Sequence, residues 1–163
     1  MQQLPVVERQ STVKTVAQFS KDGKHRYSLS MVWDESKPKA AIVMTYPSTA
    51  DELTLDQTTM LVKNNAVRNA FGGVTIVNIF SMKDHETPRS DRVNESVLLK
   101  VCDEADAVIV AYGRGMSHQE RKEEVLNMLS GYKPKLYTIK DGKGRPFAHP
   151  LSPAAHEWNV VKI

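Results

Sequence analysis

Short runs of mostly apolar residues recur along the chain from residue 40 onward, and each run has the length of a strand. They lie at residues 40–44, 74–77, 107–111 and 136–139. Runs without a polar face are typical of strands that are covered on both sides, as in a parallel sheet. The segments between them carry apolar residues at helical spacing and predict helices at about residues 57–70, 94–104 and 118–130.

The alternating order of strands and helices predicts a three-layer α/β/α sandwich around a central, mostly parallel sheet. Residues 27–33 alternate between apolar and polar side chains, which predicts a further strand with one buried face at the sheet edge. The polar residues 1–24 indicate an extended lead-in or a flexible N-terminus, and residues 25–163 indicate a single α/β domain. The charged run at 120–124 is interpreted as the solvated face of a helix.

The composition narrows the class of protein without naming a partner. A formal charge of +3 on 163 residues is too small to indicate a nucleic-acid-binding surface by itself. The single cysteine, Cys102, lies in an apolar helical stretch and is expected to be a buried thiol rather than a nucleophile or a ligand.

The sequence has neither a membrane span nor a signal peptide, so a cytoplasmic location is expected. No metal site and no cofactor are predicted, because the histidines show no ligand spacing.

Polar residues follow each of the four predicted parallel strands, at the edge where open α/β sheets bind ligands. The candidate ligand-binding residues are Tyr46, Pro47, Ser48, Thr49, Asp51, Asp56, Thr58, Asn78, Ser81, Tyr112, Gly113, Arg114 and His149. Hydroxyls, an amide, a cation and an imidazole in one crevice suit a small polar ligand. We therefore expect a small-molecule pocket at this edge of the sheet.

Several of these residues also have a purely structural interpretation. Asp56 can cap the helix that follows it, and Asn78 can satisfy backbone groups at a strand end. Arg114, between two glycines at a helix start, can meet an anionic group such as phosphate. Tyr46 and Tyr112 can stack on a base or belong to the core, and both alternatives stay open.

Five ordered motifs in the chain resemble a family of small bacterial and phage proteins known only as a domain of unknown function. The family pattern is N-P-S-T-A-D, D-x-T, V-x-N-L-F, a W-G-like turn and G-x-P-x-H-P-L. The matching segments here are Tyr46-Pro47-Ser48-Thr49-Ala50-Asp51, Asp56-Gln57-Thr58, Val77-Asn78-Ile79-Phe80, Tyr112-Gly113 and Gly144-Arg145-Pro146-Phe147-Ala148-His149-Pro150-Leu151. The resemblance implies a family but no activity.

A strand that ends before a proline, followed by a late H-P loop, is also similar to uracil-DNA glycosylases, which implies a similar α/β/α fold. In those enzymes an Asp or Asn before the proline positions the hydrolytic water, and the histidine of the late loop polarises the departing base. The resemblance implies the second role for His149 and puts Tyr46 at the position of the first. A phenol, with a reference pKa of about 10, is a poor water activator at neutral pH.

Three classes of function follow from these observations. The first is a binding protein for a nucleotide-like or nucleobase-containing small molecule, which would sequester a nucleotide signal as a phage anti-defence protein does. The second is an N-glycosidic hydrolase or DNA-glycosylase-like enzyme, with His149 as electrophile and Asp51 or Asp56 as base. The third is a protein-interaction module. The scattered charge disfavours nucleic acid as a partner, no membrane partner is expected, and oligomerisation stays open.

Overall fold

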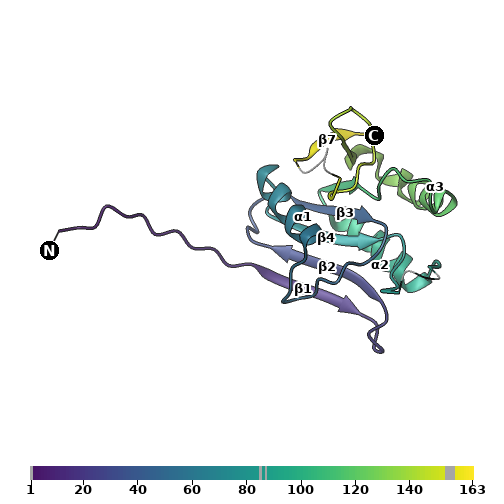
Figure 1. Cartoon of the computed structure of the whole chain (residues 1–163), viewed down its shortest axis with the longest axis horizontal. Coiled ribbons are helices and arrows are strands. Elements are labelled where there is room, and N and C mark those ends of the chain that lie inside the picture. Colours follow the sequence, from purple (N-terminus) through teal and green to yellow (C-terminus); the bar gives the residue numbers. More distant parts are fainter. Residues whose placement is uncertain (1, 85, 87, 153–156) are drawn as a thin grey trace.

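A seven-stranded mixed sheet forms the centre of the computed structural model, which describes residues 2–84, 86, 88–152 and 157–163 (Figure 1). The strands in chain order are β1 (Lys14–Phe19), β2 (Arg26–Val32), β3 (Lys39–Met44), β4 (Gly73–Asn78), β5 (Ala107–Val110), β6 (Leu136–Lys140) and β7 (Asn159–Lys162). The helices are α1 (Gln57–Arg68), α2 (Arg92–Glu104), α3 (Gln119–Met128) and the 3-10 helix η1 (Leu129–Lys135). Strands and helices alternate from β3 to β6, so the α/β class that the apolar runs predict is confirmed.

Four parallel strands lie in the middle of the sheet, whose order is β1-β2-β4-β3-β5-β6-β7. The strands β1, β2 and β7 are joined to the sheet through antiparallel pairs. In the central register, Ile42 of β3 is opposite Ile76 of β4 on one side and Ile109 of β5 on the other. The carboxyl ends of β4, β3, β5 and β6 therefore lie at the same edge of the sheet.

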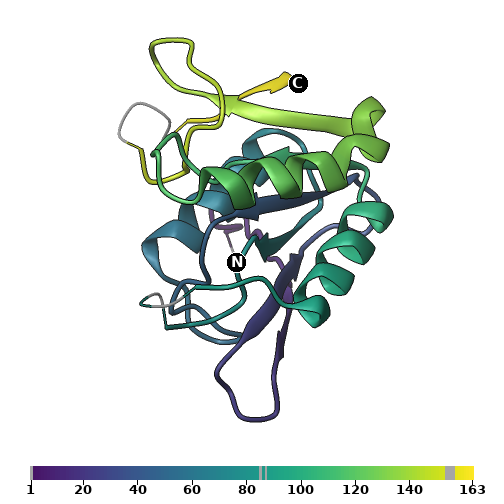
Figure 2. The same cartoon turned by 90° about the vertical axis from the view of Figure 1, so that its right-hand side faces the viewer.

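Two apolar cores cover the two faces of the sheet, because successive residues of a strand point to opposite sides. Ile42 belongs to the core that contains Val62 of α1. Val43 belongs to the other core, which contains Leu98 of α2 and Val125 of α3. Figure 2 shows α2 and α3 in front of the sheet. None of the helices in the described part of the chain has the length and apolar character that crossing a membrane requires.

The strands β1 and β7 are elements that the apolar runs do not reveal. Along β1 exposed and half-buried residues alternate, and two of its three half-buried positions, Thr15 and Ala17, are small or polar, so the period is hard to see in the sequence. Because β1 pairs with β2, the strand expected at the sheet edge lies one place further in. Residues 2–13 have no regular secondary structure and extend away from the domain (Figure 1).

Candidate functional site

A cavity of about 430 Å³ opens where β3 and β5 end, and we call it the strand-end cavity. Its wall includes Tyr46, Pro47, Ser48, Thr58, Tyr112, His118, Lys122 and His149. The hydroxyl of Thr45 donates a hydrogen bond to the carbonyl of Tyr112 at 2.8 Å, which ties the segment after β3 to the segment after β5. The cavity lies at the sheet edge that the parallel topology marks as the ligand-binding edge.

The Tyr46 side chain is held by two other rings. It stacks on Phe80, with ring centroids 5.9 Å apart and an interplanar angle of 20°. Its hydroxyl forms a short hydrogen bond with Nε2 of His118, whose ring stands edge-on to Tyr46 at 5.6 Å. Tyr46 therefore contributes a fixed aromatic wall to the strand-end cavity.

A buried cation, Lys122 of α3, lies on the side of the strand-end cavity formed by Tyr112. Lys122 is only 5% exposed, and its Nζ donates to the carbonyl of Gly115 at 2.8 Å and more weakly to that of Gly113 at 3.4 Å. The same ammonium lies 5.3 Å from the centroid of the Tyr112 ring, which stacks on Phe147. Burial lowers the pKa of Lys122, so the site favours any anion that restores the charged form.

His149 reaches the strand-end cavity from the loop after β6. Burial lowers its pKa, so the neutral imidazole is favoured. Its Nδ1 accepts a hydrogen bond from the backbone N–H of Leu151 at 3.0 Å, so the neutral ring carries its proton on Nε2. Gly113, at a φ of 86°, brings the backbone after β5 close to His149, because a Cβ on Gly113 would lie 3.6 Å from His149 Cβ. His149 can therefore donate a hydrogen bond to a ligand through Nε2.

The two candidate bases, Asp51 and Asp56, are both bound to backbone. Asp56 is the N-cap of α1 and accepts from the N–H of Thr59 at 2.9 Å, as its structural interpretation predicts. Asp51 accepts from the N–H groups of Leu53 and Thr54 at 2.9 and 2.7 Å, and these bonds lower its pKa. Of the two candidate bases, therefore, neither lines the strand-end cavity.

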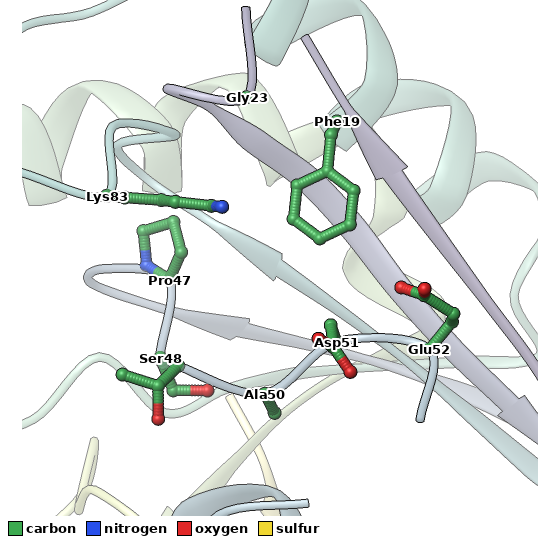
Figure 3. Close-up of a pocket in the computed structure, with 9 residues that line it drawn as sticks. Phe19, Gly23, Pro47, Ser48, Ala50, Asp51, Glu52 and Lys83 are labelled. Carbon is green, nitrogen blue, oxygen red and sulfur yellow. The ribbon is translucent and has the colours of Figure 1, made fainter. Parts of the chain in front are cut away.

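The other candidate residues do not gather in one place. Asn78 is buried, and Ser81 is buried against His25, whose Nδ1 lies 2.8 Å from the Ser81 hydroxyl. Thr49 and Asp51 line a second cavity on the other side of the segment after β3, together with Pro47 and Ser48 (Figure 3). Arg114 is exposed and lines neither cavity, so the structure does not bring it together with the other candidate residues.

The charged run at 120–124 is not wholly solvated, contrary to the interpretation of this helix from its charge pattern. Arg121 and Lys122 are 6% and 5% exposed. Arg121 donates to the carbonyl of Ile79 at 3.1 Å and pairs with Glu95 and Glu124, whereas Lys122 points to the strand-end cavity. The spacing of His118 and Lys122 by four residues is the signal that places both on one side of the start of α3.

The family profile described as a protein of unknown function (DUF1643) matches residues 26–151. The chain belongs to the DUF1643 family. Every residue of the strand-end cavity lies within the part that matches DUF1643, whereas Phe19 and Gly23 of the second cavity precede it. A search of the curated proteins and a search of the solved structures returned no match.

Metal ligands are not grouped in this DUF1643 chain as far as it is described. Within residues 2–84, 86, 88–152 and 157–163, no three His, Cys, Asp or Glu side chains come together as a metal site would require. The polar groups of the strand-end cavity are instead two imidazoles, hydroxyls and one ammonium. These are groups that bind organic and anionic ligands by hydrogen bonds.

Proposed function

We propose that this chain binds a nucleotide-like small molecule, one that combines a planar ring with an anionic group, in the strand-end cavity. The observation that carries the proposal is the meeting of Tyr46, Tyr112 and His149 with the buried ammonium of Lys122 in one cavity. Its volume of about 430 Å³ lies in the range of about 300–1,000 Å³ that small-molecule pockets have. Aromatic walls suit the ring, and the ammonium suits the anion.

The ammonium of Lys122 has capacity left for a ligand. A lysine has three N–H donors, and two of them are used on the carbonyls of Gly113 and Gly115. Within the described part of the chain, no carboxylate forms an ion pair with Lys122, and burial is the cause of its lowered pKa. A phosphate in the cavity would supply the missing counter-charge and use the third donor.

The neutral His149 supports recognition of a ring carbonyl or ring nitrogen. Because Nδ1 accepts a hydrogen bond from the N–H of Leu151, the proton of the neutral ring is on Nε2, which is therefore the donor to a ligand. We interpret the helices on both faces of the sheet as a three-layer, glycosylase-like sandwich, in which His149 keeps the base-contacting role that the resemblance implies. Tyr46 is engaged with His118 and is no water activator, so binding is favoured over N-glycosidic hydrolysis.

In this proposal the protein acts by holding its ligand rather than by converting it. Sequestration of a nucleotide signal in the cytoplasm, as in phage anti-defence, is the biological setting that we infer. The single cysteine, Cys102, is buried as a free thiol, which fits a reducing compartment. A partner protein in place of the small molecule is the alternative that the experiment must separate.

The test is isothermal titration calorimetry of the full chain with AMP, UMP, adenosine, uridine and inorganic phosphate. We expect a nucleotide to bind. Lys122→Met should weaken the binding free energy of the nucleotide by about 1.5–3 kcal/mol, the value of a hydrogen bond to a charged group. The nucleoside should be affected much less by the same substitution. Arg114→Ala is the matched control and should leave the affinity unchanged, because Arg114 is exposed.

Two results would replace the proposal. If none of these compounds binds, the strand-end cavity is not a nucleotide site, and an interaction module becomes the better interpretation. If chromatography after incubation finds free base in excess over protein, the chain is a hydrolase.

A further inference from the structure

The second cavity, of about 680 Å³, adjoins the strand-end cavity, and we call it the hairpin cavity because the β1–β2 hairpin forms one side of it. Figure 3 shows its residues, with Lys83 and Phe19 on one side and the segment from Ser48 to Glu52 on the other. Pro47 and Ser48 line both cavities. The segment that follows β3 therefore forms a wall that the two cavities share.

A buried guanidinium lies beneath this shared wall. Arg26 of β2 is 1% exposed, and its Nη1 donates to the carbonyl of Ala50 at 2.8 Å and to the carbonyl and hydroxyl of Ser48 at 3.3 Å. Its Nε and Nη2 are buried without a hydrogen-bond partner in the described part of the chain. Arg26 therefore holds the backbone of Ser48 and Ala50 in place, and the nearby Asp56 carboxylate offsets part of its charge.

A second cation and an aromatic ring meet in the hairpin cavity. The Nζ of Lys83 lies 4.6 Å from the centroid of the Phe19 ring, and Figure 3 shows the lysine side chain extending toward that ring. Phe19 and Pro47 offer apolar surfaces, and Lys83 adds a positive charge above the cavity. This combination of a ring, a cation and a serine hydroxyl is the chemistry that holds a base next to a phosphate.

The far end of the hairpin cavity is acidic. Asp51 and Glu52 lie there, and the Asp51 carboxylate is fixed on the backbone of its own turn. Two carboxylates repel a polyanion that would continue past this end, but they accept hydrogen bonds from amino or hydroxyl groups. The anionic part of a ligand therefore belongs away from this end, on the side of the shared wall, and the ligand should be short.

We propose that the two cavities are the two halves of one site, and that the ligand has two ring units joined by a phosphate, as in a dinucleotide. One ring and the phosphate lie in the strand-end cavity, with the phosphate on Lys122, and the ligand crosses the shared wall at Ser48 so that the second ring packs against Phe19 beneath Lys83. The inference rests on the proposed function, because it assigns the first ring to the same cavity. Beyond the proposed function, the inference specifies how long the ligand is and which residues contact its second ring.

The experiment compares one-unit and two-unit ligands on the full chain by isothermal titration calorimetry. The probes are AMP and UMP, the dinucleoside monophosphates ApA and UpU, and a single-stranded deca-adenylate. We expect a dinucleoside monophosphate to bind about tenfold or more tightly than the matching mononucleotide, as stacking of one further base implies.

Substitutions in the hairpin cavity separate the two halves of the site. Phe19→Ala and Lys83→Met should each remove most of the advantage of the two-unit ligand and leave the affinity for the mononucleotide unchanged. Lys21→Met is the matched control, because Lys21 is an exposed lysine of the same hairpin that lines neither cavity. It should change neither affinity.

Failure of this inference and failure of the proposed function give different results. If mononucleotides bind but the dinucleoside monophosphates bind no tighter, the inference is wrong and the proposed function stands. Equal weakening of both ligand classes by Phe19→Ala and Lys83→Met would also overturn the inference. Tighter binding of the deca-adenylate than of ApA would overturn the two-unit limit, and loss of all binding would overturn the proposed function itself.

Discussion

The hydroxyl of Tyr46 and Nε2 of His118 form a hydrogen bond between two segments that lie 72 positions apart in the chain. One segment follows β3, and the other leads into α3. The backbone of His118 is in the left-handed region, at a φ of 60°, and this turns its ring toward Tyr46 at the helix start. The pair closes one side of the strand-end cavity, where the resemblance to glycosylases would put a water-activating residue.

A double-mutant cycle measures how strongly this pair is coupled. Tyr46→Phe keeps the ring that stacks on Phe80, and His118→Asn keeps a residue that tolerates the left-handed backbone. We expect a coupling free energy of about 0.5–1.5 kcal/mol, as for a typical hydrogen bond, from urea denaturation of the four proteins. Strictly additive effects of the two substitutions would show that the hydrogen bond contributes nothing to stability.

The half-buried His149 makes the stability of the fold depend on pH. Burial holds the pKa of His149 in the folded state below the ordinary 6.5. Between the two pKa values, His149 is therefore protonated in the unfolded chain and neutral in the folded chain. This contribution is complete above pH 6.5 and is lost as the pH falls toward the folded-state pKa. Wild-type protein should therefore lose more unfolding free energy than His149→Asn between about pH 7.5 and 5. Parallel pH profiles of the two proteins would remove His149 as the cause.

Asp56 should matter for stability and not for ligand chemistry. Burial works to raise its pKa, but hydrogen bonds from the Ser48 hydroxyl and from Thr59 outweigh burial, so its pKa lies below the ordinary value. Asp56→Ala should cost about 0.5–2 kcal/mol of unfolding free energy, as loss of an N-cap does. Glu52→Ala, in an exposed part of the same loop, is the control and should cost far less. An equal cost for both substitutions would argue against the capping role.

Cys102 should be inert in the folded protein. It is buried in the core between the sheet and α2, and burial raises its pKa to about 12. The thiolate that reacts with thiol reagents is therefore nearly absent at neutral pH. We expect labelling by a disulfide reagent only as fast as the protein unfolds, with a large acceleration in urea. Since the chain has a single cysteine, the signal belongs to Cys102 alone, and fast labelling without urea would contradict its burial.

The fold was more predictable from sequence than the site. The predicted helix at 94–104 is α2, Arg92–Glu104, and the predicted run at 40–44 is β3, Lys39–Met44. These elements follow from periodicity along a few neighbouring residues, which the sequence displays directly. The strand β1 was missed because its pairing with β2 comes from a partner strand rather than from its own apolar content.

Charge pattern was the weakest guide to the site. Arg114 lies between two glycines, as an anion-binding residue does, yet it is exposed. Lys122 lies in a run of charged residues that predicts a solvent-exposed helix face. The structure instead buries Lys122 in the wall of the strand-end cavity. Arg114 lies in the loop before α3 and Lys122 lies in the first turn of α3, so the direction of each side chain depends on local backbone that the charge pattern does not show.

By itself, the sequence determined the α/β class, the order of the central elements and the sheet edge at which polar strand ends collect. Those properties depend on local periodicity and on the rule that parallel strands end together. Only the tertiary structure decided that Tyr46 and His118 pair, that Lys122 and not Arg114 lines the strand-end cavity, and that a second cavity shares Pro47 and Ser48. The physical reason is that side chains from separate segments meet according to strand order, loop backbone and burial, which no segment encodes alone.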